Sequence, residues 1–357
     1  MIVERPHPVL EQAAGLELEP VRALDAIREE WAALAARTGN VFASWEWNAT
    51  WWKHFGESGR LLTMACRDRD GRLVAVLPLY LWRSRPLRVV RFLGHRGADE
   101  LGPICEPADR EAVAAALRTT LATAKAHVFV GERLPVQAGW GTLLGARPLT
   151  REASPTLRFE HSDWEEFLRT KSANFRGQVR QRERRLFRDF EAGYRLATDP
   201  ARLQDDLGTL FALHKARWGE GATDFQQRES FHREFAAQAL DRGWLRLWLL
   251  EVDGVVRAAD YGFRFHGVES YYQGGRDPDW NAHSVGFVLL MHAIRTSVAD
   301  GMREFRLLRG GEDYKYRLAN VDDELETVGV TRGLLAGAAL SAVARGRKTR
   351  IVRALRG

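Results

Sequence analysis

The same hairpin pattern occurs twice in this chain, at Met64–Leu79 and at Trp248–Gly262. Each copy is an apolar run, an Asp-Gly pair and a second apolar run, and the pairs begin at Asp70 and Asp253, 183 residues apart. An Asp-Gly pair between apolar runs is a strong signal for a β-hairpin. Each copy also follows segments with helical spacing of apolar residues. The repeat therefore predicts two copies of one α/β module in tandem.

The length of 357 residues is also consistent with two modules. Turn-forming residues between Pro148 and Pro155 mark the expected boundary. We therefore predict a first module at 16–150, a second at 151–331 and a basic tail at 332–357. Each module should be of the α/β (α+β) class, with a mixed, mostly antiparallel sheet flanked by helices.

The predicted elements follow the apolar spacing along the chain. In the first module we expect helices at 22–37, 42–55 and 109–126 and strands at 61–67, 73–82, 87–93 and 127–130. In the second we expect helices at 172–190, 203–218, 228–242 and 284–300, with strands at 245–252, 255–265, 268–274 and 304–308.

Composition excludes several classes of protein. Hydrophobic residues make up 45% of the chain, which rules out intrinsic disorder. The longest apolar run, Leu334–Ala344, is too short to cross a bilayer, and no signal peptide is visible at the N-terminus. The two cysteines cannot form a disulfide framework, and no Cys/His cluster has zinc spacing. We therefore expect a cytoplasmic protein without a metal cofactor.

The formal net charge of +6 comes from two basic patches. Eight basic residues and one acid lie between Arg169 and Arg188, and seven basic residues and no acid follow from Arg332 to the end. Such patches are typical of phosphate-bearing partners such as tRNA, or of an anionic membrane surface on which residues 334–355 would lie as an amphipathic helix. The alternative is a solvated helix face and a loosely ordered tail.

Two segments of the second module have the residue types of an anion site. Gly274–Phe287 runs from two glycines through a polar loop to Ser284, which is placed to cap the following helix. Gly286 keeps the first helical turn open, and free N–H groups at a helix start favour phosphate. At the end of another helix, Arg217 beside Trp218 could clamp an anionic substrate. Alternatively, Ser284 is only a cap and Trp218 only a core residue.

A third segment, Leu308–Arg317, combines many titratable groups. A predicted strand runs into two glycines, and Glu312, Asp313, Tyr314 and Lys315 follow. Catalytic residues are often carried on such loops. A salt-bridged surface turn is the structural alternative.

These segments, in this order, resemble the CelD-like branch of the GNAT (N-acetyltransferase) superfamily, and the tandem modules are similar in architecture to the FemABX transferases. The resemblance is best from about Ser172 to Val330 and extends weakly over the first module, at Phe42–Trp47. It is carried by Arg217-Trp218, Tyr271-Tyr272-Gln273-Gly274-Gly275, Ser284-Val285-Gly286 and Gly311-Glu312-Asp313-Tyr314-Lys315. The stretch Asn281–Gly286 keeps only the last glycine of the family's Gln/Arg-x-x-Gly-x-Gly/Ala signature.

The resemblance implies acyl transfer from a thioester to an amine. It implies that the donor, acetyl-CoA or another acyl-CoA, lies between the strands at 268–274 and 304–308. Its diphosphate would rest on the helix start, at Ser284, Val285, Gly286 and Phe287. A backbone N–H around Gln273 or Gly274 would polarise the reacting carbonyl.

The same resemblance implies the proton-transfer roles. Asp260 or Glu312 would accept the proton of the amine, and Tyr271, Tyr272 or Tyr314 would protonate the leaving thiolate. Lys315 would stabilise negative charge at the acceptor or the carbonyl. The substrate would contact Arg217, Trp218 and Tyr271.

Three functions are therefore open from the sequence. The first is an acyl-CoA-dependent N-acyltransferase acting on a small-molecule amine or amino sugar of a polysaccharide or envelope pathway. The second is a FemABX-like transferase whose donor is aminoacyl-tRNA, with the basic patches following tRNA phosphates. The third is a non-catalytic GNAT-fold binding protein.

Overall fold

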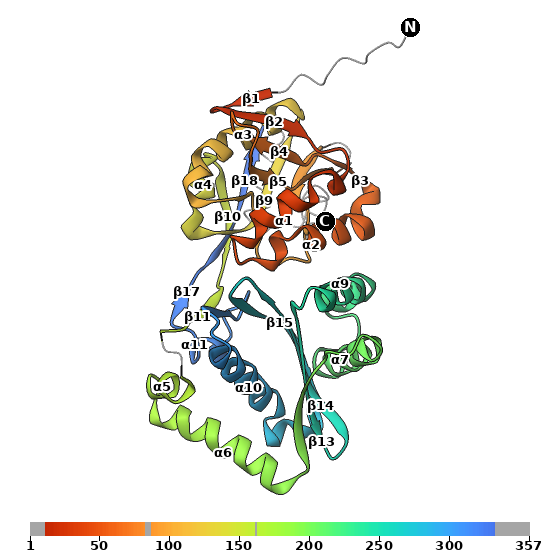
Figure 1. Ribbon diagram of the computed structural model, residues 1–357, viewed down its shortest axis with the longest axis vertical. Coiled ribbons are helices and arrows are strands. Elements are labelled where there is room, and N and C mark those ends of the chain that lie inside the picture. Colours follow the sequence, from red (N-terminus) through yellow and green to blue (C-terminus); the bar gives the residue numbers. More distant parts are fainter. Residues whose placement is uncertain (1–10, 83–86, 161–162, 333–357) are drawn as a thin grey trace. The chain divides into compact units, whose positions relative to one another are not determined.

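The computed structural model describes residues 11–82, 87–160 and 163–332, which form two compact units (Figure 1). The first unit contains residues 11–38, 42–151 and 325–332, and the second contains Gly39–Val41 and Glu152–Glu324. The basic tail expected at 332–357, including the amphipathic segment at 334–355, lies outside the described residues apart from Arg332.

The last strand of the chain belongs to the first unit. Strand β18 (Leu325–Thr331) pairs antiparallel with β9 (Val128–Pro135), with Val328 opposite Gly131. The end of the second module predicted at residue 331 is therefore seven residues late, because the second unit ends at Glu324. The local pattern of β18 marks it as a strand, but only its long-range pairing shows which sheet it joins.

A seven-stranded mixed sheet forms the centre of the second unit, in the order β12-β13-β14-β15-β16-β11-β17. Its strands are β11 (Pro155–Arg158), β12 (Ala192–Leu196), β13 (Leu245–Val252), β14 (Val255–Phe265), β15 (Val268–Arg276), β16 (Glu304–Arg306) and β17 (Val321–Asp322). Neighbouring strands are antiparallel except β15 and β16, which are parallel. The predicted mixed, mostly antiparallel sheet is confirmed.

The turn between β13 and β14 is the predicted Asp-Gly hairpin. Asp253 and Gly254 both have positive φ, at 49° and 74°. A type I′ turn requires this at both central residues, and its twist matches that of the flanking strands.

Helices cover both faces of this sheet (Figure 1). Helices α7 (Leu203–Trp218) and α9 (Glu229–Asp241), with the short α8 (Asp224–Gln227), lie on one face, and α10 (Val285–Ala299) lies on the other. Helix α6 (Ala173–Asp189), which follows α5 (Trp164–Arg169), packs on α10 through Phe175, Val179 and Leu186. The short α11 (Asp313–Tyr316) follows β16.

The first unit repeats the plan of the second. Its strands are β1 (Glu11–Ala13), β2 (Leu16–Pro20), β3 (Gly59–Leu61), β4 (Met64–Arg67), β5 (Leu73–Leu77), β6 (Leu79–Trp82), β7 (Val89–Phe92), β8 (Ile104–Cys105), β9, β10 (Arg147–Glu152) and β18. Its α-helices are α1 (Arg28–Ala36), α2 (Trp45–Phe55), α3 (Arg110–Thr123) and α4 (Trp140–Leu143). The parallel pair β7–β9 flanks α3 in the chain as β15–β16 flanks α10. The predicted tandem repeat is therefore present.

The first unit differs by dividing its strands between two sheets, in the orders β1-β2-β4-β5-β8 and β10-β18-β9-β7-β6-β3. The single strand predicted at 73–82 is interrupted at Pro78, between β5 and β6. Proline lacks the N–H that a continuous central strand would donate.

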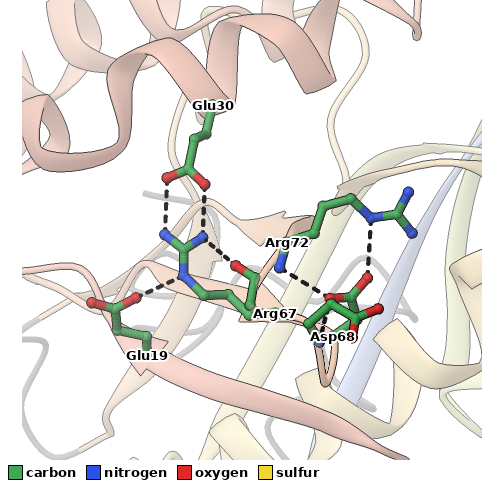
Figure 2. Close-up of polar contacts among 7 residues, drawn as sticks. Glu19, Glu30, Arg67, Asp68 and Arg72 are labelled. Carbon is green, nitrogen blue, oxygen red and sulfur yellow. Dashed lines mark hydrogen bonds and ion pairs between the residues drawn. The ribbon is translucent and has the colours of Figure 1, made fainter.

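An arginine at the hairpin of the first unit joins three elements (Figure 2). Arg67 at the end of β4 donates to Glu30 of α1 through both terminal nitrogens, at 2.7 and 2.9 Å, and its Nε donates to Glu19 of β2 at 3.0 Å. In the adjoining turn, Asp68 accepts hydrogen bonds from the backbone and side chain of Arg72. These contacts hold the β4–β5 turn against β2 and α1.

The helices in the described part of the chain include none with the length and apolar character needed to span a bilayer.

Candidate functional site

The parallel strands β15 and β16 separate after three paired residues. Val268–Ser270 pair with Glu304–Arg306, whereas β15 continues to Arg276 beside β14 alone. A register shift between Tyr261 and Gly262 of β14 lies opposite the point of separation. Such irregularities bend a strand and increase its twist. Among the described strands, none pairs with the end of β15 on the β16 side.

A cavity of about 300 Å³ lies at this end of β15. Eight of the residues selected from the sequence line it: Arg217, Asp260, Tyr271, Gly274, Ser284, Gly286, Phe287 and Tyr314. The remaining lining residues are Arg182, Gly275, Arg276, Asn281, Leu290 and Arg317. The cavity therefore brings together residues of α6, α7, β14, β15 and α10, all within the second unit.

Gly274 leaves room for the side chains of two residues predicted at the site, Tyr271 and Asp260. It lies opposite Asp260 in the β14–β15 register. A Cβ at Gly274 would overlap the hydroxyl of Tyr271 and lie 3.0 Å from Oδ1 of Asp260. A glycine is therefore required for the phenol and the carboxyl group to approach the backbone here.

Asp260 has the properties of an acid–base group. Its side chain is only 5% exposed, and its Oδ2 has no hydrogen-bond partner among the described residues. Burial raises the pKa of Asp260 to about 8, although the nearby Arg217 acts to lower it. The carboxyl group is therefore mostly protonated at neutral pH and becomes a base just above it, which is the range in which proton transfer is most effective.

Two tyrosines beside Asp260 can donate protons. Burial raises the pKa of Tyr271 well above its ordinary value, and the charge of Asp260 raises it further. Burial and the charge of Glu312 raise the pKa of Tyr314. Both phenols therefore keep their protons at neutral pH, so each can act as a hydrogen-bond or proton donor toward the cavity.

The start of α10 is open toward the same cavity. Ser284 occupies the predicted N-cap position but has a left-handed φ of 57°, and its side chain makes no capping hydrogen bond. The first N–H groups of a helix need partners from outside the helix. Val285, also expected at the site, is fully buried in the core and does not line the cavity. At Gly286 the absent side chain leaves room beside Arg276, whose Cδ would lie 3.3 Å from a Cβ there.

Four arginines line the cavity, and none of them forms an ion pair with a carboxylate in the described ranges of the chain: Arg182, Arg217, Arg276 and Arg317. Three of them donate to neutral oxygens, namely the carbonyl of Gly274 and the side chains of Asn281 and Gln178. Because Asp260 is protonated at neutral pH, their charge is not balanced within the cavity. Guanidinium groups in this state favour phosphate and carboxylate ligands.

Three further residues expected at the site lie outside the cavity lining. Tyr272 is buried among aromatic rings of α8 and α9, 6.2 Å from Phe225 and 5.6 Å from His232. The side-chain oxygen of Gln273 lies 3.2 Å from Nε2 of His214 on α7. Trp218 is exposed, with the guanidinium of Arg217 4.6 Å from the ring centre. The first two side chains stabilise the packing of the helices on the sheet.

Glu312 and Lys315 also lie outside the lining. Lys315 is buried, and its Nζ donates to the carbonyl of Leu308 at 3.3 Å and to the carbonyl of Arg309. Glu312 is exposed and lies 3.1 Å from the same Nζ. Lys315 therefore holds the loop after β16, rather than contacting the cavity in which the other groups meet.

Sequence reasoning did not select three of the four cavity arginines. Arg182 lies within the basic stretch for which the sequence predicts a nucleic-acid or membrane partner, and Arg276 and Arg317 lie within segments that are predicted to be functional because of other residues. The charge of these residues was visible in the sequence. Their convergence was not, because it depends on the packing of α6 against α10.

No group of three or more His, Cys, Asp and Glu side chains that could hold a metal ion is present in residues 11–82, 87–160 and 163–332.

Comparison with known proteins relates part of the second unit to a domain family and the chain to known folds. Residues 173–316 match the acetyltransferase (GNAT) domain. The structure of FemX superposes with a TM-score of 0.63 at 11% identity, covering 85% of this chain and 96% of FemX. The C-terminal domain (DUF2156) of a putative lysylphosphatidylglycerol synthetase from Agrobacterium fabrum gives a TM-score of 0.58 at 12% identity, covering 91% of this chain and 96% of that domain.

L-PGS from Bacillus licheniformis gives a TM-score of 0.54 at 11% identity, covering 90% of this chain and 97% of that structure. At these identities the similarity establishes the fold. No curated protein matches the sequence.

Proposed function

Because residues 173–316 form a GNAT domain within a tandem fold like that of FemX, we propose that this protein is an N-acyltransferase. It would move an acyl group, most simply acetyl, from an acyl-CoA to the amine of a small molecule or amino sugar. One observation carries the proposal. A single cavity joins a buried acid–base carboxyl group, an uncapped helix start and four arginines without carboxylate partners.

The residues of the cavity fit an anionic donor. The backbone N–H groups of Gly286 and Phe287 and the guanidinium of Arg276 would hold the diphosphate, since helix starts and arginines both favour phosphate oxygens. The separated end of β15 would accept the pantetheine arm along its unpaired edge. The thioester carbonyl would then lie near Gly274, Asp260 and Tyr271.

The pKa shifts of Asp260, Tyr271 and Tyr314 support a route for proton transfer at this centre. The ammonium group of the acceptor would lose a proton to the Asp260 carboxylate, and the free amine would attack the acyl carbon. A C–N bond forms and the C–S bond breaks. The thiolate would take a proton from Tyr271 or Tyr314, and the phenolate left behind would take the second N–H proton of the attacking nitrogen, which gives the neutral amide. Asp260 is preferred over Glu312 as the base because Asp260 lines the cavity, whereas Glu312 is exposed and paired with Lys315.

A donor other than acyl-CoA is the second candidate. The FemX-like fold and the basic helix α6 support an aminoacyl-tRNA donor, whose phosphates would follow the arginines. Binding of a polyanion weakens steeply with salt because counterions are released. Salt dependence of donor binding therefore separates this candidate from the first, and loss of turnover in active-site variants would argue against a purely binding role.

The direct test is calorimetric titration of the full chain with acetyl-CoA at two salt concentrations. We expect micromolar binding that Gly286→Glu abolishes, because the new carboxylate would meet Arg276 and repel the diphosphate. Gly208→Glu is the matched control. It places the same residue inside α7, where a Cβ would lie 3.6 Å from Arg233, and it should bind like the unchanged protein.

Absence of acetyl-CoA binding by the folded protein would contradict this donor. Tight, strongly salt-dependent binding of charged tRNA in its place would favour the second candidate.

A further inference from the structure

The four cavity arginines form two groups. Arg217 lies close enough to Asp260, Tyr314 and Arg276 to affect the pKa of each. These residues surround the reaction centre and the start of α10. Arg182 and Arg317 line the same cavity, but each lies over an aromatic ring, Phe287 and Phe175 respectively. They form a second basic group in the cavity wall.

The second region is built on a pair of aromatic rings. Phe175 of α6 and Phe287 of α10 contact edge to face, with ring centres 6.0 Å apart. The guanidinium of Arg182 lies 4.9 Å from the centre of Phe287, and that of Arg317 lies 5.0 Å from the centre of Phe175. Cation–π contacts of this kind orient a guanidinium while leaving its N–H edges free to bind an anion.

Gln178 completes this region with a neutral contact. Its Oε1 accepts a hydrogen bond of 2.8 Å from Nη2 of Arg317. No carboxylate of the described residues forms an ion pair with Arg182 or Arg317, whereas Arg180 on the same helix pairs with Glu165. Two oriented guanidinium groups without counter-charges at a cavity wall are the arrangement expected for a phosphate.

We infer that Arg182 and Arg317 form a second anion subsite, which selects a donor carrying a phosphomonoester in addition to its diphosphate. This inference rests on the proposed function. With the diphosphate at the start of α10, the second subsite would hold the 3′-phosphate of coenzyme A. Through Arg182, helix α6 would thus help the domain to prefer coenzyme A over donors that lack the 3′-phosphate.

The test compares coenzyme A with 3′-dephospho-coenzyme A by calorimetric titration of the full chain. The unchanged protein should bind coenzyme A roughly 10-fold or more tightly, since charge-assisted hydrogen bonds to phosphate are worth this much. Arg182→Gln and Arg317→Gln should each weaken the binding of coenzyme A and leave the binding of 3′-dephospho-coenzyme A unchanged. The ratio of the two dissociation constants should then approach one. Arg276→Gln should weaken the binding of both ligands by the same factor.

Arg184→Gln is the matched control, because Arg184 is an exposed arginine of α6 that does not line the cavity. It should leave both affinities unchanged. The subsite would be overturned if the unchanged protein bound the two ligands with equal affinity. It would also be overturned if Arg182→Gln and Arg317→Gln kept the preference for coenzyme A over 3′-dephospho-coenzyme A. Either result would leave the proposed function in place. Binding of neither ligand by the folded protein would overturn both, and binding of short RNA instead would assign the arginines to a nucleic-acid donor.

Discussion

At Asp260 the carboxyl group is buried at the wall of an arginine-rich cavity, and burial outweighs Arg217 in raising its pKa to about 8. Only the ionised form can accept the proton of the acceptor amine. We therefore expect kcat/KM for acyl transfer to rise with pH and to level above about pH 8. Asp260→Asn should lower kcat/KM about 100-fold or more and remove this rise, as is usual for loss of a general base.

The pH profile measured between pH 6 and 9 checks this assignment. Glu312→Gln is the control, because Glu312 is exposed and outside the cavity lining, and it should keep both the rate and the profile. If Asp260→Asn retained the rise with pH while Glu312→Gln lost it, the base would be Glu312.

At the scale of elements, the contact between β15 and α7 fixes the position of Arg217 relative to the strand. Gly275 makes this contact possible, since a Cβ there would lie 2.6 Å from the backbone nitrogen of His214 and 2.8 Å from the carbonyl carbon of Leu213. Gly275→Ala should therefore push α7 from the sheet, at a cost of about 1–3 kcal/mol in the free energy of unfolding.

Urea denaturation of Gly275→Ala measures this cost. Gly193→Ala, in strand β12 where a Cβ would contact nothing within 4 Å, is the matched control, and it should be at least as stable as the unchanged protein. A Gly275→Ala variant of unchanged stability would mean that α7 and β15 can separate slightly without penalty.

Elements with long, regular patterns were predictable from the sequence. Helix α7 and strands β13 and β14 have the predicted bounds, because their apolar spacing is uninterrupted and Gly219 and the Asp253-Gly254 turn end them clearly. The short β11, β12 and β17 and the helix α5 were not predicted. Strands of two to five residues carry too few positions for a periodic pattern, and they exist because a neighbouring strand supplies their hydrogen bonds.

The candidate site was predictable only in part. Loop glycines and polar clusters identified the end of β15 and the start of α10, and eight predicted residues do line one cavity. Strand alternation and a bulge decide that Tyr271 faces the cavity while Tyr272 packs among aromatic rings. Lys315 looked chemically active, but its burial against two carbonyls could not be read from its type.

For the whole molecule, the tandem plan gives the first unit two sheets and the second unit one, and each unit its own core. The chain reaches the first unit a second time through β18, which lies between β10 and β9 in its sheet. Units with separate cores can unfold separately. A change in β18 should therefore affect the first unit, although in sequence β18 directly follows the second.

Val328→Asp tests this independence. Val328 is fully buried in β18, so an aspartate there should destabilise the first unit by about 3–5 kcal/mol, the usual cost of an uncompensated buried charge. Hydrogen exchange measured by mass spectrometry should show loss of protection in β7 and β9 and retention in β13, β14 and β15. Val255→Asp, at an exposed position of the second unit, is the control and should leave hydrogen-exchange protection unchanged in both units. Simultaneous loss of protection in both units would mean that the tandem modules fold as one cooperative body and that the site depends on both cores.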